Sequence, residues 1–157
     1  MLTLSLAFAG LAAVTSAVAY GTDVFAAIVL RPAFVGLDDA ALVQSAGRIH
    51  QYADQRMPFP GAAGTLAAAA AALTAGLADH PLQAVLCAGA LLALLAWLAL
   101  YVAIAAPINR ELTRAAAARE TPAHTRALQT RWDSIIGPRV ALQSTALVLL
   151  VSALAFT

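Results

Sequence analysis

The chain has 157 residues, enough for one domain, and 62% of them are hydrophobic while only 11% are charged. Its net charge of +1 offers no clustered basic face, so we expect no binding to nucleic acid. The mean hydropathy of +0.82 and repeated apolar runs of spanning length predict an all-α integral membrane protein, with residues 1–157 forming a single four-helix transmembrane domain in the lipid bilayer.

The first apolar run predicts a membrane-spanning helix over about residues 2–31. No charge interrupts it before Asp23, and it ends at Arg31-Pro32. A helix of this length would measure about 45 Å, whereas the hydrocarbon core of a bilayer is about 30 Å thick. We therefore expect this helix to tilt or to project from the membrane.

An additional helix is predicted over residues 38–55, between the first and second spans. Asp38 or Asp39 can cap its start. The segment RMPFPG at residues 56–61 then breaks the helix and turns the chain back into the membrane. The apolar residues of this helix fall on one stripe, so we expect it to lie against the end of the bundle or in the cytoplasmic membrane interface. This stripe consists of Leu42, Ala46, Ile49 and Ala53.

Three further spans are predicted over about residues 61–78, 82–106 and 138–156. The first is rich in alanine, and the second carries no charge at all. Pro138 either starts the last helix or kinks a longer helix that begins near Thr121-Pro122, where threonine can cap and proline suits the first helical position.

The distribution of arginine predicts how the chain crosses the membrane. Four spans place both termini on one side and residues 31–60 and 107–139 on the other. All nine basic residues are arginines, and all lie in these two segments. Because positive charge is retained in the cytoplasm, we expect a multi-pass protein of the plasma or inner membrane with cytoplasmic connections and both termini outside.

Asp23 and Arg139 are candidate catalytic residues within the spans. Ionisable side chains there are costly and need a polar cavity or a partner. Arg139 and Gln143 share one face of the last helix, and Asp23 is a candidate partner for that arginine. Together they could bind an enolate or phenolate oxygen, with Gln143 as a substrate-binding residue. Alternatively, Asp23 lies at the membrane boundary and pairs with an arginine only for orientation.

His50 is the third candidate catalytic residue, and Asp54 shares its helix face because the two are four residues apart. The pair could orient the imidazole as a general base or supply two metal ligands. A metal site needs three or four ligands, so we expect no metal here. The sequence also has no glycine-rich phosphate loop, HExxH or CxxC motif, so we expect no other resident cofactor. Arg56 is a candidate for substrate binding. The alternative is a solvated helix face.

Asn109 and Trp132 are further candidates for substrate binding. Asn109 follows Pro107 at the end of the third span, where its amide could donate to a substrate oxygen; it could equally be an interfacial cap. Trp132 is typical of the membrane headgroup region.

Four stretches of the chain resemble the anthrone oxygenase-like membrane proteins, a family that mostly carries a domain of unknown function. They occur in the order of the family and extend over nearly the whole chain. The resemblance implies a four-helix membrane bundle. Characterised fungal members oxidise an anthrone to an anthraquinone with dioxygen, without an established organic cofactor. The matching stretches are AYGTDVFAAIVLRPA (19–33), GRIHQYADQRMPFPG (47–61), PINRELTRA (107–115) and RWDSIIGPRVALQ (131–143).

The resemblance extends to individual residues, with two departures. Asn109 matches the asparagine that closes the third helix of the family, and Trp132 and Arg139 match its tryptophan and arginine around the fourth. Family members often have asparagine directly after that tryptophan and histidine four residues after it. This chain has Asp133 and Ile136 there. His50 could take the place of the missing histidine.

These observations predict a small, monooxygenase-like membrane oxidoreductase that acts on a lipophilic aromatic or enolic molecule. His50 would remove a proton, Arg139 and Asn109 would hold the oxyanion, Asp23 would orient Arg139, and dioxygen would be the co-substrate. The rival hypothesis is a non-catalytic module, such as an accessory subunit or a lipid- or small-molecule-binding scaffold. In that case the four side chains would point to separate surfaces. Both hypotheses are compatible with a homo-oligomer.

Overall fold

The structure, a computed structural model, describes residues 1–156, and all regular structure within them is helical. Four continuous helical segments are long and apolar enough to cross a membrane: Leu2–Val35, Pro58–Gly76, Pro81–Ala118 and Thr125–Ala155. The individual elements are α1 (Leu2–Phe25), the π-helical turn η1 (Ala26–Leu30), α2 (Arg31–Val35), α3 (Asp39–Arg56), α4 (Pro58–Gly76), α5 (Pro81–Leu100), the π-helical turn η2 (Tyr101–Ala105), α6 (Ala106–Ala118) and α7 (Thr125–Ala155).

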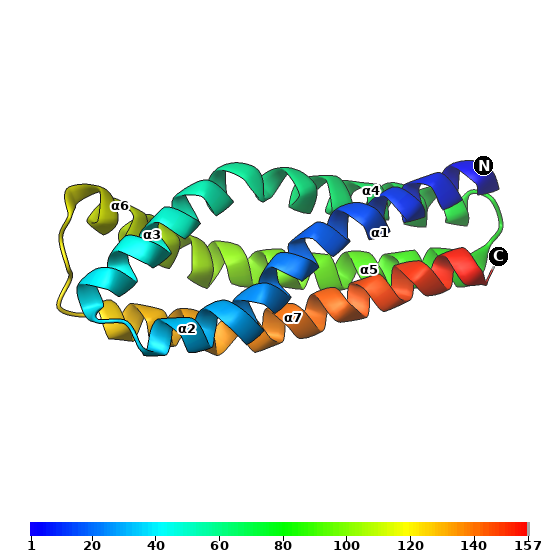
Figure 1. The fold of residues 1–157 in the computed structure, drawn as a ribbon. Helices are drawn as coiled ribbons and strands as arrows, with labels where there is room; N and C mark the ends of the chain where they lie inside the picture. Colours follow the sequence, from blue (N-terminus) through cyan, green and yellow to red (C-terminus); the bar gives the residue numbers. More distant parts are fainter. Residues whose placement is uncertain (157) are drawn as a thin grey trace.

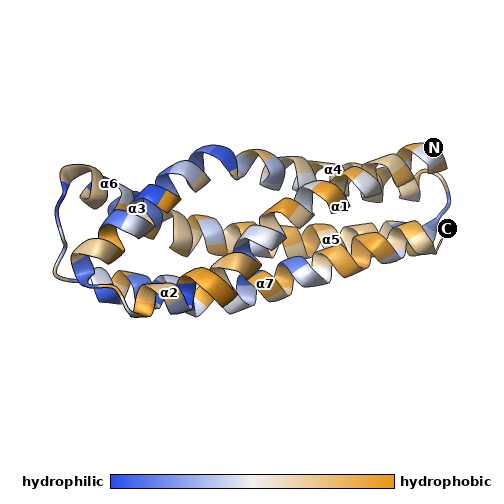
Figure 2. Ribbon diagram, in the orientation of Figure 1, coloured by the Kyte–Doolittle hydropathy of each residue, from blue (hydrophilic) through white to orange (hydrophobic). Residues whose placement is uncertain are grey.

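The four long segments form an elongated bundle with both termini at one end and α3 and α6 at the other (Figure 1). Around the bundle, α1 packs against α4 and α7, and α5 packs against the same two helices. Hydrophobic residues dominate the half that holds the termini, whereas hydrophilic residues gather on α3 and the first part of α7 (Figure 2). The predicted four-helix architecture is therefore confirmed.

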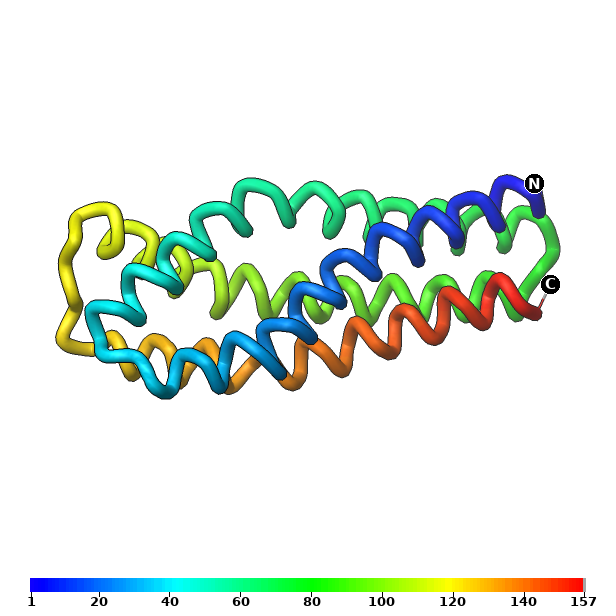
Figure 3. Tube along the Cα trace, viewed as in Figure 1, coloured from blue at the N-terminus to red at the C-terminus, as the bar shows by residue number. Residues whose placement is uncertain are grey.

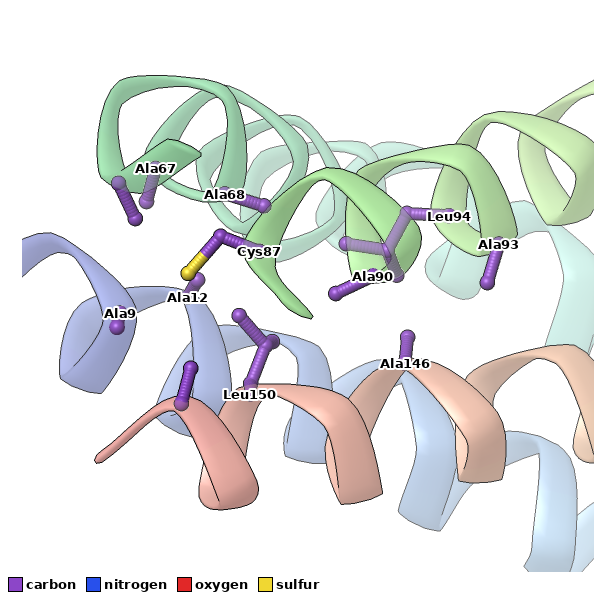
Figure 4. Close-up of a cluster of buried hydrophobic side chains, with 12 residues drawn as sticks. Ala9, Ala12, Ala67, Ala68, Cys87, Ala90, Ala93, Leu94, Ala146 and Leu150 are labelled. Carbon is purple, nitrogen blue, oxygen red and sulfur yellow. The ribbon is translucent and has the colours of Figure 1, made fainter. Parts of the chain in front are cut away.

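The core of the terminal half is built mainly from alanine (Figure 4). Small side chains let the helix backbones approach closely, which is how apolar helices associate when water supplies no driving force. Gly64 on α4 marks such an approach, because a Cβ atom there would lie 2.6 Å from the Oγ of Ser16. The buried cluster comprises Ala9, Ala12, Ala67, Ala68, Ala71, Cys87, Ala90, Ala93, Leu94, Ala146, Leu150 and Ala153.

Helices α5–α6 and α7 extend further than the predicted spans. The third helical segment continues to Ala118 instead of ending near residue 106, and the last begins at Thr125 instead of 138. Pro138 therefore lies inside a longer helix, the second of the two alternatives. Its ring faces outward. Proline can be accommodated within a helix when its neighbours re-satisfy the freed backbone group.

The predicted break at residues 56–61 is reduced to a single residue, Met57, between α3 and α4. Its conformation is close to helical, with φ −71° and ψ −25°. The backbone hydrogen bonds continue across it, from Met57 N to Ala53 O at 2.8 Å and from Gly61 N to Met57 O at 3.2 Å. Pro58 suits the first position of α4, because proline has no N–H group that would need a partner there. Since Met57 is nearly helical, the chain passes from α3 into α4 without reversing.

Both π-helical turns end two residues before a proline. Segment η1 ends at Leu30, before Pro32, and η2 ends at Ala105, before Pro107. A proline ring clashes with the carbonyl four residues earlier, and in both cases that carbonyl belongs to the π-helical turn. We attribute the two wide turns to these prolines, since such turns relieve an interrupted hydrogen-bond ladder.

Helix α3 forms nearly where it was predicted and begins with the expected cap, because Asp38 Oδ1 accepts a hydrogen bond from Ala41 N at 2.7 Å. Its buried face differs from the predicted stripe. Ile49 is exposed, whereas His50 is buried. The difference arises because α3 packs mainly on α6, and the face of α3 that contacts α6 is the one that carries the small residue Gly47. The buried residues of α3 are Leu42, Val43, Ala46, Gly47 and His50.

Gly47 is the point of closest approach between α3 and α6. A Cβ atom there would lie 2.4 Å from the carbonyl oxygen of Leu112 and 2.5 Å from the Cβ of Ala116. Two hydrogen bonds join the helices at the same level, from Thr113 Oγ1 to Gly47 O at 3.1 Å and from Gln44 Nε2 to Ala116 O at 3.2 Å. This contact fixes α3 on the rest of the molecule.

We predict that Gly47→Ala lowers the free energy of unfolding in detergent by about 1–3 kcal/mol, because backbone atoms must move apart to admit the methyl group. Gly10→Ala is the matched control, since a Cβ at Gly10 meets nothing within 4 Å. That control should leave stability unchanged or raise it by up to about 1 kcal/mol. Equal effects of the two substitutions would contradict the close packing of α3 on α6.

Candidate functional site

A cavity of about 260 Å³ lies in the half of the bundle that is covered by α3. Both π-helical turns contribute to its wall, η1 through Ala26 and Leu30 and η2 through Tyr101. Widened turns of this kind frequently occur at functional sites. Most of the wall is apolar or aromatic, and its polar and charged residues are Thr22, Asp23, Arg31, His50, Asp54, Tyr101, Asn109, Gln129 and Arg139.

A buried ion pair between Asp23 of α1 and Arg139 of α7 forms one side of this cavity. Arg139 Nη2 donates to Asp23 Oδ1 at 2.9 Å, and Arg139 Nε donates to Oδ2 at 3.1 Å. Trp97 Nε1 donates to the same Oδ2 at 3.0 Å, and Gln143 Nε2 also donates to it. The carboxyl group of Asp23 is thus surrounded by donors, which compensates for the cost of burying it.

The guanidinium group of Arg139 also lies close to two aromatic rings. Its Cζ lies 5.7 Å from the ring centres of both Trp97 and Tyr101, within the range of cation–π attraction. The two bonds to Asp23 use Nε and Nη2. In the part of the chain that the structure describes, Nη1 has no such partner and can donate to a molecule in the cavity, where the guanidinium group supplies a fixed positive charge.

A second hydrogen-bonded network begins at Asp54 of α3. Its Oδ1 accepts from Tyr101 Oη and from Asn109 Nδ2, both at 2.9 Å. Asn109 Oδ1 in turn accepts from Trp132 Nε1 at 3.0 Å. Asn109 thus connects α6, α3 and α7. Within residues 1–156, Asp54 binds these partners and not the imidazole of His50, so it does not orient the imidazole in the way that the spacing of the two residues allowed.

His50 lies between the two networks and is only 8% exposed. Its ring centre is 5.5 Å from that of Trp132. Burial lowers the pKa of His50 from its usual 6.5 to about 4; the charge of Arg139 acts in the same direction, and that of Asp54 opposes it. The imidazole is therefore neutral at pH 7 and can accept a proton or a hydrogen bond.

The structure brings five of the predicted site residues together. Gln143 lies behind the cavity wall, where it binds Asp23, and is fully buried. Arg56 lies outside: it is exposed, donates to Tyr52 O at 3.3 Å and stacks over the Tyr52 ring. This position gives Arg56 no contact with the cavity. The five that line the cavity are Asp23, His50, Asn109, Trp132 and Arg139.

Two aromatic residues of the site, Trp97 and Tyr101, were not identified from the sequence. They are four residues apart in an otherwise aliphatic run, which places them on one face of the third helical segment. That spacing was the available signal. It was easy to overlook because aromatic rings also gather at membrane interfaces without any role in a site.

Within residues 1–156, no group of three or more histidine, cysteine, aspartate or glutamate side chains is placed to hold a metal ion. No protein-family model, curated protein or solved structure matches the chain. The geometry of the cavity is therefore the basis for a functional proposal.

Breaking the buried ion pair should be costly. We predict that Arg139→Gln lowers the free energy of unfolding by about 3–5 kcal/mol, because it leaves the carboxyl group of Asp23 buried without its counter-ion. The double variant Asp23→Asn with Arg139→Gln should be the more stable of the two, since neither charge remains. Arg126→Gln, which breaks the exposed pair with Asp39, should cost less than about 1 kcal/mol. Denaturant titrations in detergent would test this order.

The lowered pKa of His50 predicts a pH dependence of stability. In the unfolded chain the imidazole takes up a proton near its usual pKa of 6.5, whereas in the folded protein it stays neutral down to about 4. Stability should therefore fall as the pH falls from about 6.5 to 4, by about 3 kcal/mol in all, with no further loss from this group below that range. His50→Gln should reduce this fall, as measured by denaturant titrations at pH 7 and 4.5. An unchanged pH dependence would contradict burial of a neutral imidazole.

Proposed function

We propose that the protein is a membrane-embedded enzyme that oxidises a lipophilic, weakly acidic aromatic or enolic molecule with dioxygen. The observation that carries this proposal is a single cavity shared by a neutral imidazole and a fixed guanidinium group, His50 and Arg139. In the rival scaffold hypothesis these residues would face separate surfaces. Their convergence supports the enzyme.

His50 would act as the general base. A neutral imidazole has a lone pair to accept the proton of an acidic C–H or O–H group. Its basicity is weak in the empty cavity, but an anion forming beside it would favour the imidazolium form and raise the pKa of His50. Arg139 would stabilise the developing oxyanion through its free Nη1, since it is already oriented by Asp23 and needs little rearrangement.

With an anthrone as substrate, the steps balance without a further reductant. His50 takes the proton from the CH₂ group, and the resulting enolate carbon forms a bond to dioxygen. The peroxide anion takes that proton back from His50 and becomes a hydroperoxide. The hydroperoxide then loses water: its O–O bond breaks, the second hydrogen leaves the same carbon, and a carbonyl group remains. Dioxygen accepts the electrons. The chain has to supply only the base, the oxyanion-binding group and a dry, aromatic-lined cavity.

The position of the site fits a substrate that arrives from the cytoplasmic leaflet. All nine arginines lie in segments at the end of the bundle that carries α3 and α6. We place this end at the cytoplasmic face by the preference of basic residues for that side. Helix α3 would then cover the site at the membrane interface, and both termini would lie outside.

The test is anthrone oxidation by the purified protein in detergent. The reaction rate is measured as dioxygen consumption and as the increase in anthraquinone absorbance. The wild type should exceed the spontaneous rate in protein-free micelles. We expect His50→Gln to lower the rate at least about 100-fold, which is typical for loss of a general base. Asp23→Asn with Arg139→Gln should also lower it, because the oxyanion loses its partner.

Arg48→Gln is the matched control, because Arg48 is an exposed arginine of the same helix as His50 and does not line the cavity. It should leave the rate unchanged. If the His50 and Arg139 variants are folded, as judged by gel filtration and circular dichroism, and oxidise anthrone at the wild-type rate, the proposal is wrong. It is equally wrong if the wild type does not exceed the micelle background.

A further inference from the structure

A second cavity, of about 380 Å³, lies between α4 and α5, beside the first. Four residues line both cavities. In Figure 3, the start of α4 lies away from the third helical segment, and the two approach each other toward residues 77–80. The second cavity lies where these helices separate, and we call it the α4–α5 groove. The shared residues are Met57, Trp97, Tyr101 and Arg139.

Apart from these shared residues, the wall of the groove is almost entirely apolar. The single polar side chain among the others belongs to Thr65, whose hydroxyl group donates to the carbonyl oxygen of Gly61 at 2.9 Å and is thereby occupied. Arg139, at the junction with the first cavity, is the one charged residue of the wall. The remaining residues of the wall are Pro58, Gly61, Ala62, Leu66 and Leu98.

Gly61 keeps the groove open beside Trp97. A Cβ atom at this position would lie 3.1 Å from Cη2 of the indole ring. Any side chain here would therefore press on Trp97, which also donates to Asp23. The width of the groove and the position of the ion pair thus depend on the same tryptophan.

We propose that the α4–α5 groove binds the apolar chain of a lipophilic acid whose anionic head lies at Arg139, and that it opens laterally to the bilayer as the entry path. The groove lies within two segments that are long and apolar enough to span a membrane. A molecule dissolved in the bilayer can enter it without passing through water. This proposal rests on the proposed function, which assigns the first cavity as the site of the reaction. It adds the class of substrate, a lipophilic acid, and the path by which the substrate enters.

Charge complementarity selects a lipophilic acid over a neutral lipid. Arg139 lines both cavities, and within residues 1–156 its two hydrogen bonds to Asp23 use Nε and Nη2 and leave Nη1 without a partner, so an anionic oxygen there gains a charge-assisted hydrogen bond in surroundings of low dielectric constant. The groove, at about 380 Å³, has a volume within the range of small-ligand sites, and the first cavity, at about 260 Å³, adds space beside it. This arrangement fits a head group in the first cavity and a single chain in the groove.

Binding can be measured without turnover, because both tryptophans of the chain, Trp97 and Trp132, line the first cavity and Trp97 also lines the groove. In a Trp132→Phe background, bromine on a bound chain should quench the remaining tryptophan by contact. The probe is dibromostearic acid in detergent micelles. We expect saturable quenching by the acid and at least about tenfold weaker quenching by its methyl ester, which lacks the charge.

Two matched threonine substitutions on α4 test the location. Thr65→Phe fills the groove and should weaken binding of the acid about tenfold. Thr74→Phe should leave binding unchanged, since Thr74 makes the same kind of hydrogen bond to the carbonyl four residues earlier but lies outside the groove. The neutralised variant Asp23→Asn with Arg139→Gln should bind acid and ester alike, and it leaves no unpaired buried charge that would prevent folding.

Three outcomes would overturn the proposal: equal quenching by acid and ester, equal effects of the two threonine substitutions, or stronger quenching by a brominated two-chain phospholipid than by the free acid. Saturable binding of the acid together with no anthrone oxidation would reject the proposed enzyme and retain the groove. Oxidation of anthrone without acid-selective quenching would reject the groove proposal and retain the proposed enzyme. The two proposals can therefore fail separately.

Discussion

The ion pair between Asp23 and Arg139 is the interaction on which the site depends. It joins the first and last of the four long helical segments through two residues that are 116 positions apart in sequence, and both side chains are buried. A pair this deeply buried gains little net stability from its own attraction, because both groups lose their hydration. Trp97 and Gln143 also donate hydrogen bonds to the carboxylate of Asp23. Because Trp97 lies on α5, the third helical segment takes part in the same contact. Stability alone does not account for this arrangement, whereas a fixed charge beside a cavity does.

The prolines explain how a tightly packed bundle has room for a cavity. The terminal half is packed with alanine, and its helices approach closely. The two π-helical turns lie beyond this region, each before a proline, and both contribute residues to the cavity wall. A wide turn changes the direction in which the following side chains point. Pro32 and Pro107 thereby separate a packed half from a hollow half within the same four helices.

Much of the fold could be predicted from the sequence, because apolar runs of spanning length carry a strong signal. Asp23 and Arg139 could be paired for the same reason, since each needs a partner in an apolar environment. Helix ends were predicted less well, because the first and third segments continue to Val35 and Ala118, past Pro32 and Pro107, instead of ending near residues 31 and 106. At Pro138 the longer helix was one of two alternatives, and it is the one that forms. The partners of Asp54 could not be predicted, because they come from segments about 50 residues away and depend on how α3 is oriented.

The proposed chemistry depends on a helix that is not one of the four spans. Arg139 is held by the bundle itself, whereas His50 is supplied by α3, whose position is fixed mainly by its contact with α6. Gly47 lies at the centre of that contact and only three residues before His50, so backbone packing there sets the depth at which the imidazole enters the cavity. In the proposed function the base comes from the covering helix α3 and the oxyanion-binding group from the bundle, so a small movement of α3 on α6 would separate the two while the bundle stayed intact.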